Sequence, residues 1–191
     1  ATVRVGKWQR GDMAGRRPHD RGVDAWYCIP RTSNESMFTS TPGFDPEVVP
    51  MPYVMEGQAG ESARELHVYD LDARRQIDAD LTERTIAFMR SHAGKKPFFA
   101  YVPLTQLHFP TLPHKDFAGR SGAGDFADSM VEMDHRVGQM LDAVAARGTP
   151  ANSWSFLAGA TGPAFLGPSL GPPGPWNVPP HRAHHRASAV P

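Results

Sequence analysis

Lysine and histidine each follow a strand-like segment in this sequence, and both residue types can bind an anion. Lys7 lies directly after the β-branched alternation of residues 2–5, where it could place a point charge on an anionic group. His108 follows the apolar run of residues 97–102 and could act as a general acid or a ligand near neutral pH. Two alternatives stay open at this point: a solvated surface charge for Lys7, and a histidine hydrogen-bonded to its own loop for His108.

The remaining titratable residues offer less chemistry. His114 stands between a proline and a lysine and is expected to face solvent, while Asp134 and His135 suit the solvated edge of a helix. The one cysteine, Cys28, excludes an internal disulfide framework and any multi-cysteine metal site. The histidines within residues 181–186 could bind a transition metal only weakly, because their spacing in a proline-rich segment is unspecific.

Two segments have the apolar spacing of helices. Residues 77–92 form the first, with Asp78 and Asp80 expected at its N-terminus and Gly94 placed to end it. Residues 125–147 form the second, and their methionines are expected to fill the core. The side chains expected to share its apolar face are Phe126, Met130, Met133, Val137, Met140, Leu141 and Val144.

Three further segments are predicted to be strands. They are residues 2–5, a buried strand at residues 97–102 and a third at residues 153–157. Residues 10–75 are expected to be irregular, with one short strand at residues 66–69. The alternation of strands and helices predicts an α/β layered sheet, in which ligands bind beyond the carboxyl ends of the strands. The loops of interest then start at Gly6, Pro103 and Ala158.

Composition limits the classes of function. The chain has 191 residues with 20 basic and 20 acidic side chains, so its formal net charge is zero. The lack of a basic field disfavours nucleic acid and anionic membranes as partners. No apolar run approaches the length of about 18 residues that a membrane-spanning helix needs. The hydrophobic content of 40% is that of a folded chain.

Glycine and proline are over-represented, with 18 and 19 residues respectively. Part of this excess lies in residues 10–75 and part in residues 167–191, a segment without Asp, Glu or Lys. We expect residues 1–166 to form one partial catalytic domain and residues 167–191 to be a disordered tail. A strand starts almost at the first residue and no initiating methionine precedes it, so the chain is expected to be a fragment.

Four ordered motifs together resemble one known family. They are GKWQRG (residues 6–11), RGVDAWY (21–27), PFFAYV followed by HFP (97–102 and 108–110), and DHRVGQMLD (134–142). They are similar to GKWHLG, G-F-D-x-F/W-Y, PFFLYLP…PHxP and D-x-x-V/I-G-x-(I/L/M)-L-D of the type I sulfatases in the alkaline-phosphatase-like superfamily. The resemblance runs from about residue 2 to residue 165. It implies an α/β fold with a layered, mixed or mostly parallel sheet and flanking helices.

The same resemblance implies hydrolysis of sulfate monoesters to an alcohol and sulfate. In this family a formylglycine nucleophile attacks sulfur, and calcium polarises the sulfate oxygens. Lys7 matches the sulfate-contacting lysine, and His108 matches the histidine that contacts sulfate and the leaving group. Both are expected to be catalytic, and together with Gln9 they form the expected substrate-binding set. The implied partner is a sulfate-ester small molecule or a sulfated glycan.

The sequence also departs from the family pattern. Gln9 replaces the second histidine, and Ala160-Thr161 stands where the family has a calcium-binding Asp-Asn pair. The motif Cys28-Ile29-Pro30-Arg31 is not taken as C-x-(P/A)-x-R, because Arg31 comes one residue early and the motif follows the lysine loop. The family places its nucleophile and other acidic ligands upstream of GKW. No residue of this chain is therefore assigned to calcium or to a formylglycine.

These departures leave three functional hypotheses. The first is a sulfuric ester hydrolase of which this chain is an incomplete and inactive piece. The second is a non-catalytic relic with at most a binding role. The third is a phosphatase or phosphodiesterase of the same superfamily. The motifs around Lys7 and His108 favour a sulfatase over a phosphatase, while Ala160-Thr161 favours the relic over a working enzyme.

Overall fold

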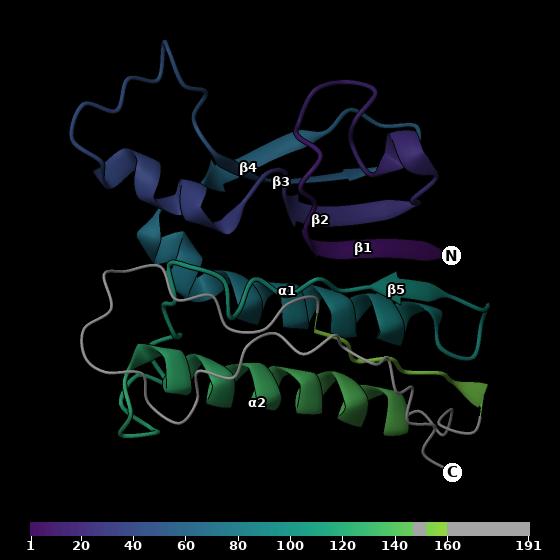
Figure 1. Ribbon diagram of the computed structural model, residues 1–191. Helices are drawn as coiled ribbons and strands as arrows, with labels where there is room; N and C mark the ends of the chain where they lie inside the picture. Colours follow the sequence, from purple (N-terminus) through teal and green to yellow (C-terminus); the bar gives the residue numbers. More distant parts are fainter. Residues whose placement is uncertain (147–151, 160–191) are drawn as a thin grey trace, which may run out of the picture. The chain divides into compact units, whose positions relative to one another are not determined.

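The computed structural model describes residues 1–146 and 152–159, and the described residues form a five-stranded sheet (Figure 1). Its order is β4-β3-β2-β1-β5. β1 pairs in parallel with β2 and β5, whereas β3 is antiparallel to β2 and β4. The strands are β1 (Thr2–Lys7), β2 (Ala25–Ile29), β3 (Tyr53–Gln58), β4 (Arg64–Val68) and β5 (Phe99–Tyr101). The predicted α/β class with a mixed sheet and flanking helices is confirmed.

Residues 10–75 contain more regular structure than the sequence predicted. Three strands lie here, β2, β3 and β4, together with the 3₁₀ helices His19–Arg21 and Ser33–Ser40. The prediction of a single short strand was wrong because long loops rich in Gly and Pro separate the strands and mask their local patterns. β2 is buried almost throughout, since it lies between β1 and β3.

Helix α1 (Leu71–His92) covers one face of the sheet (Figure 1). It begins six residues earlier than predicted, because the Asp70 side chain caps it by accepting a hydrogen bond from the Ala73 amide at 2.8 Å. Asp78 and Asp80 therefore lie inside the helix and not at its N-terminus. The helix ends as predicted just before Gly94, which has a φ of +74°.

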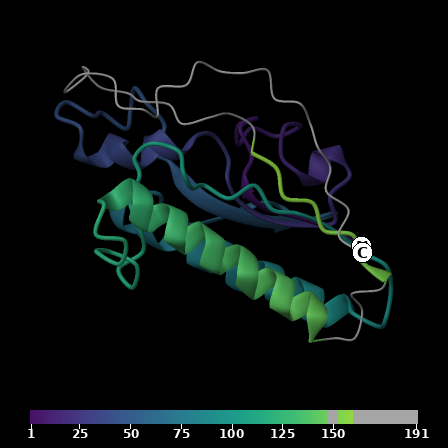
Figure 2. The same cartoon turned by 60° about the horizontal axis from the view of Figure 1, so that its bottom comes forward.

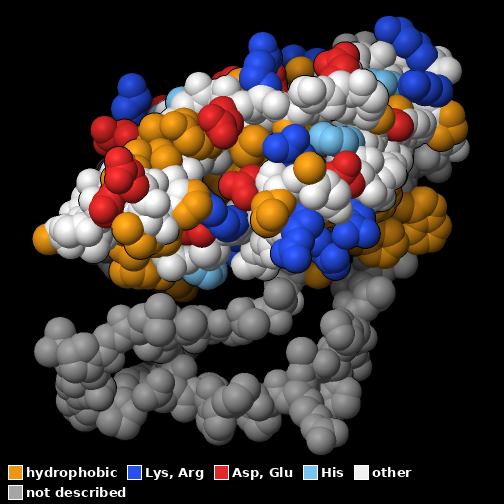
Figure 3. Space-filling view, turned by 90° about the horizontal axis from the view of Figure 1, so that it is seen from above, with side chains coloured by type: hydrophobic (Ala, Val, Ile, Leu, Met, Phe, Trp, Pro, Cys, Tyr) orange, Lys and Arg blue, Asp and Glu red, His pale blue; other side chains and the backbone are white. Residues whose placement is uncertain are grey.

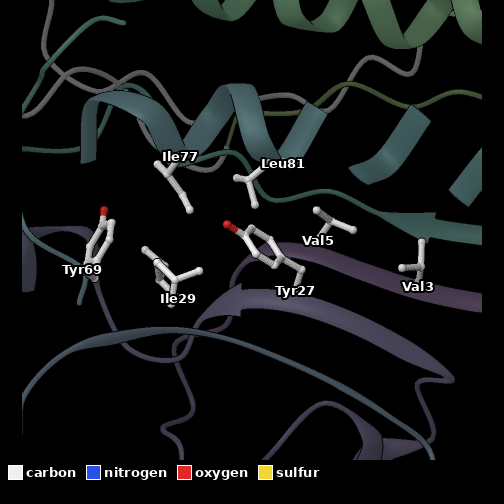
Figure 4. Close-up of a cluster of buried hydrophobic side chains, with 8 residues drawn as sticks. Val3, Val5, Tyr27, Ile29, Tyr69, Ile77 and Leu81 are labelled. Carbon is white, nitrogen blue, oxygen red and sulfur yellow. The ribbon is translucent and has the colours of Figure 1, made fainter. Parts of the chain in front are cut away.

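The principal core lies between α1 and the sheet. Figure 4 shows Ile77 and Leu81 of α1 directed toward Tyr27, Ile29 and Val5 of the strands, and all five side chains are buried. A second cluster packs on the opposite face of the sheet, consisting of Trp8, Trp26, Cys28 and Met55. Both faces of the central strands are thus covered, which holds α1 and the ends of β1 and β2 in a fixed relation.

Helix α2 (Asp125–Ala145) lies alongside α1, as Figures 1 and 2 show. Its start agrees with the prediction, but its expected apolar face is confirmed only in part, since Met133, Val137, Met140 and Val144 are half-buried. Phe126, Met130 and Leu141 are 42%, 47% and 49% exposed, whereas the side chains it buries include Ser129 and Glu132. α2 contacts its neighbours through this polar side, because the loop before it brings hydrogen-bonding groups there.

Two of the predicted strands differ from expectation. β5 lies at the edge of the described sheet, so Phe99 and Tyr101 are exposed and the strand is not buried. Residues 153–157 form no strand. The chain divides into two units, Ala1–Asn152 and Ser153–Pro191. Ala160-Thr161 and the predicted tail at residues 167–191 lie outside the described residues.

Side chains of both charges are present on the face shown in Figure 3, in keeping with the zero net charge. Among the helices that the structure describes, none combines the length and apolar character of a membrane span.

Candidate functional site

Lys7 is the last residue of β1, next to the start of the loop that carries His108. The Lys7 amide donates a hydrogen bond to the Pro103 carbonyl at 3.0 Å. Gly6 makes this approach possible, because a Cβ added to it would lie 2.1 Å from the Pro103 oxygen and because its φ is +133°. The predicted loops at Gly6 and Pro103 thus meet at the same edge of the sheet.

The Lys7 side chain is neither fully solvated nor fully buried. Burial lowers the pKa of its ammonium, the positive charge of Arg74 lowers it further, and the negative charge of Asp78 opposes both. A cation that has already lost part of its hydration is a better partner for an anion than a freely solvated one. Lys7 therefore differs from an ordinary surface charge.

His108 lies in the exposed part of the loop, and its ring is oriented by a neighbouring backbone group. Nδ1 lies 2.7 Å from the Phe109 carbonyl oxygen. Since a carbonyl can only accept, Nδ1 carries the proton in the neutral ring and Nε2 has the lone pair. The ring is thus bonded to its own loop, as one alternative expected, while Nε2 stays suited to binding a ligand or exchanging a proton.

A buried ion pair on α1 connects the Lys7 and His108 regions. Arg74 and Asp78 are 0% and 1% exposed, and their charged groups lie 3.6 Å apart. Arg74 donates to the His108 carbonyl at 3.0 Å, and Asp78 accepts from the Thr105 amide at 2.8 Å. Sequence analysis missed this pair; the available signal was a charged pair at i, i+4 on the helix face that also carries Ile77 and Leu81.

A second buried carboxylate holds the distal end of the same loop. Glu132 of α2 is 0% exposed, accepts from the His114 amide at 2.8 Å and faces Arg136 at 3.3 Å. His114 is 8% exposed, and its Nε2 lies 2.9 Å from Gln76 Oε1. The expectation that His114 faces solvent was wrong, because these groups draw it between α1 and α2. Asp134 and His135 are exposed, as expected.

Gln9 and Cys28 differ in their surroundings. Gln9 is exposed with a φ of 59°, and within the described residues no hydrogen bond joins it to Lys7 or His108. Cys28 is 1% exposed inside β2, where burial raises the pKa of its thiol. Arg31 pairs with Glu35 at 2.9 Å. Cys28 is therefore a packing residue and does not fit the family's nucleophile.

The described residues do not fit the family's calcium either. They contain no group of three or more His, Cys, Asp or Glu side chains that could hold a metal ion. Asp78 is the carboxylate whose charge acts on Lys7, but its two oxygens accept hydrogen bonds from Thr105 and face Arg74. A hard cation needs several free oxygen ligands. No step of the proposed reaction is therefore assigned to a metal ion.

The known proteins that match this chain in sequence are sulfatases. No protein-family model matches the chain. It is 26% identical to N-acetylgalactosamine-6-sulfatase of Rattus norvegicus over 165 residues, which cover 85% of this chain and 30% of that protein. It is 28% identical to rat arylsulfatase G over 189 residues, or 90% of this chain and 36% of the relative. Bovine arylsulfatase A is 34% identical over 97 residues, 48% of this chain and 19% of that protein.

Solved structures share the architecture. The crystal structure of PsFucS1 sulfatase from Pseudoalteromonas sp. matches 77% of this chain and 32% of its own with a TM-score of 0.68 at 21% identity. The fold is thus that of the alkaline-phosphatase-like α/β proteins. Within this class, the relatives matched by sequence are sulfatases, and these matches support the type I sulfatase family for this chain. It spans about a third of the length of the rat relatives.

Proposed function

We propose that the protein to which this sequence belongs hydrolyses a sulfate monoester to an alcohol and sulfate, with Lys7 and His108 in contact with the sulfate group. The observation that carries the proposal is the half-buried Lys7 at the end of β1, beside the loop of His108, in a fold shared with sulfatases. The family membership of the relatives points to the same reaction.

The two side chains have complementary roles in this proposal. When the bond between sulfur and the ester oxygen breaks, negative charge develops on the sulfate oxygens and on the leaving oxygen. Lys7 stabilises the charge on sulfate. In the imidazolium form of His108, in which Nδ1 keeps its bond to the Phe109 carbonyl, Nε2 also carries a proton and gives it to the leaving alcohol. Gln9 can hydrogen-bond to the sulfate or the alcohol, but it cannot transfer a proton near neutral pH.

The substrate class follows from the relatives. They include an N-acetylgalactosamine-6-sulfatase and arylsulfatases, so the proposed substrate is a sulfated glycan or a small sulfate ester. In the intact family, calcium and a formylglycine supply the Lewis acid and the nucleophile. The described residues fit neither, so we propose that the 191-residue chain alone binds sulfate without hydrolysing an ester.

Binding is tested with inorganic sulfate as the probe. The chain has four lysines, Lys7, Lys95, Lys96 and Lys115, and their ε-carbon signals can be followed by NMR in a ¹³C-labelled sample during a sulfate titration. We expect the Lys7 and His108 signals to shift with one common Kd. Lys7→Gln should weaken binding about tenfold, a change of about 1.4 kcal/mol. The matched control is Lys115→Gln, at an exposed position, which should leave the Kd unchanged.

Turnover is tested separately. The purified chain with calcium and a formylglycine-generating enzyme should release no sulfate from 4-nitrophenyl sulfate above a heat-killed control. Release above that control would contradict the proposed inactivity of the chain.

A non-catalytic binding protein is the second candidate function. It is favoured by Gln9 in place of a proton-transferring histidine and by Ala160-Thr161 in place of acidic and amide ligands. A phosphatase is distinguished by the anion: tighter binding of inorganic phosphate than of sulfate at the same pH would favour it over a sulfatase.

A further inference from the structure

Arg74 directs its terminal NH groups into the loop that carries His108, while its buried Nε has no hydrogen-bond partner among the described residues. Besides its bond to the His108 carbonyl, it donates to Thr105 Oγ1 at 2.8 Å and to Gln106 Oε1 at 2.9 Å. These acceptors lie along four consecutive residues of the loop, so one planar guanidinium fixes the path of the chain into His108. A lysine ammonium at this position could not reach all three acceptors at once.

Asp78 completes the connection from the next turn of α1. Its two oxygens accept from the Thr105 amide at 2.8 Å and from Thr105 Oγ1 at 2.5 Å. Thr105 is thus held by both members of the ion pair. Because Ile77 and Leu81 anchor the same turns of α1 in the core (Figure 4), the pair is a rigid support and not a mobile surface contact.

We infer that Arg74 and Asp78 are positioning residues, which fix the His108 loop relative to Lys7 so that both side chains face one sulfate group. This inference rests on the proposed function. It is carried by the four Arg74 hydrogen bonds to residues 105–108 and by the two from Thr105 to Asp78.

The alternative is a purely structural ion pair, and two observations argue against it. Replacing a buried ion pair by apolar side chains is often neutral or stabilising, so packing alone does not require these charges. The charges of both residues also act on Lys7, in opposite directions.

Two conservative variants separate geometry from charge. Arg74→Lys keeps the positive charge but loses the fork of donors. Asp78→Asn removes the charge but keeps an acceptor for the Thr105 amide and a donor for its hydroxyl. The matched control is Arg90→Lys, at an exposed position on the same helix. Each variant is examined by NMR of the full chain for the tautomer of the His108 ring, the pKa of Lys7 and the Kd for inorganic sulfate.

The expected results differ between the variants. Arg74→Lys should weaken sulfate binding about tenfold and reduce the share of the Nδ1-protonated tautomer of His108, because the Phe109 carbonyl is no longer held in place. Asp78→Asn should keep the tautomer and the sulfate Kd within about threefold, while the pKa of Lys7 falls because an opposing negative charge is lost. Arg90→Lys should change none of the three readouts.

The inference is overturned if Arg74→Lys leaves both the His108 tautomer and the sulfate Kd unchanged, or if Asp78→Asn loses binding as strongly as Arg74→Lys does. If Arg74→Lys does not give the spectrum of a folded chain, Thr105→Ala removes the same link from the loop side, and Thr105→Ser should restore it. Failure of the wild-type chain to bind sulfate would refute the proposed function instead. The tautomer and the pKa of Lys7 would then still decide the positioning role.

Discussion

Gly6→Ala tests how closely the end of β1 must approach the loop that carries His108. The new methyl group would lie 2.1 Å from the Pro103 oxygen, well inside van der Waals contact, and the residue would keep a φ of +133° only under strain. Strained backbone costs about 1–3 kcal/mol and overpacking about 1–3 kcal/mol. Displacing Pro103 also breaks its bond to the Lys7 amide, which contributes about 0.5–1.5 kcal/mol.

We therefore expect Gly6→Ala to lower the free energy of unfolding by about 3–7 kcal/mol, a large part of the stability of an ordinary domain. The assay is urea unfolding followed by tryptophan fluorescence, with Trp8 buried directly after β1 and Trp26 buried within β2. The matched control is Gly11→Ala, where φ is +88° but no atom lies within 4 Å of the added Cβ. Its free energy of unfolding should fall only by the cost of the strained backbone, about 1–3 kcal/mol. Equal losses in the two variants would refute the close approach at Pro103.

Two further predictions concern titration and the surface. Tyr69 is 1% exposed and burial raises its pKa, so its stabilising contribution is present below about pH 10 and is lost as the pH rises further. In urea unfolding above pH 10, Tyr69→Phe should therefore lose stability less steeply than wild type, by about 1.4 kcal/mol per pH unit, and equal slopes would contradict this. Met130→Lys and Leu141→Lys, at half-exposed positions of α2, should each change the free energy of unfolding by less than about 1 kcal/mol. Losses of about 2–5 kcal/mol would instead mean that these side chains are in the core, as the sequence periodicity suggested.

The elements with strong local patterns were predicted well from sequence. α2 begins at Asp125 as expected, and α1 ends before Gly94. β1 includes the predicted residues 2–5, and β5 lies within the predicted residues 97–102. The start of α1 was placed too late because the cap is a single aspartate, Asp70, and the first turns after it are mostly polar.

The errors have a common physical origin in tertiary contacts. β2 and β3 derive their stability from neighbours in the sheet, which a local pattern among loops does not reveal. The apolar spacing of α2 indicated a helix correctly but only part of the side that is buried. That side is set by Glu132 and by the backbone amide of His114, a partner 18 residues away.

In the candidate site, too, residues in local motifs could be predicted, whereas residues joined by tertiary contacts could not. Lys7 and His108 could be identified because the motifs around them are short and local. Arg74 and Asp78 could not, because their partners, Thr105 and its neighbours in the loop, come about 30 residues later and are joined only by the fold.

A crystal structure of the 191-residue chain with bound inorganic sulfate tests the central claim most directly. The account predicts one sulfate with oxygens about 2.7–3.1 Å from both Lys7 Nζ and His108 Nε2. Sulfate bound only at other positions, or a Lys7 and His108 more than about 8 Å apart and thus too distant for one sulfate to bridge, would contradict it.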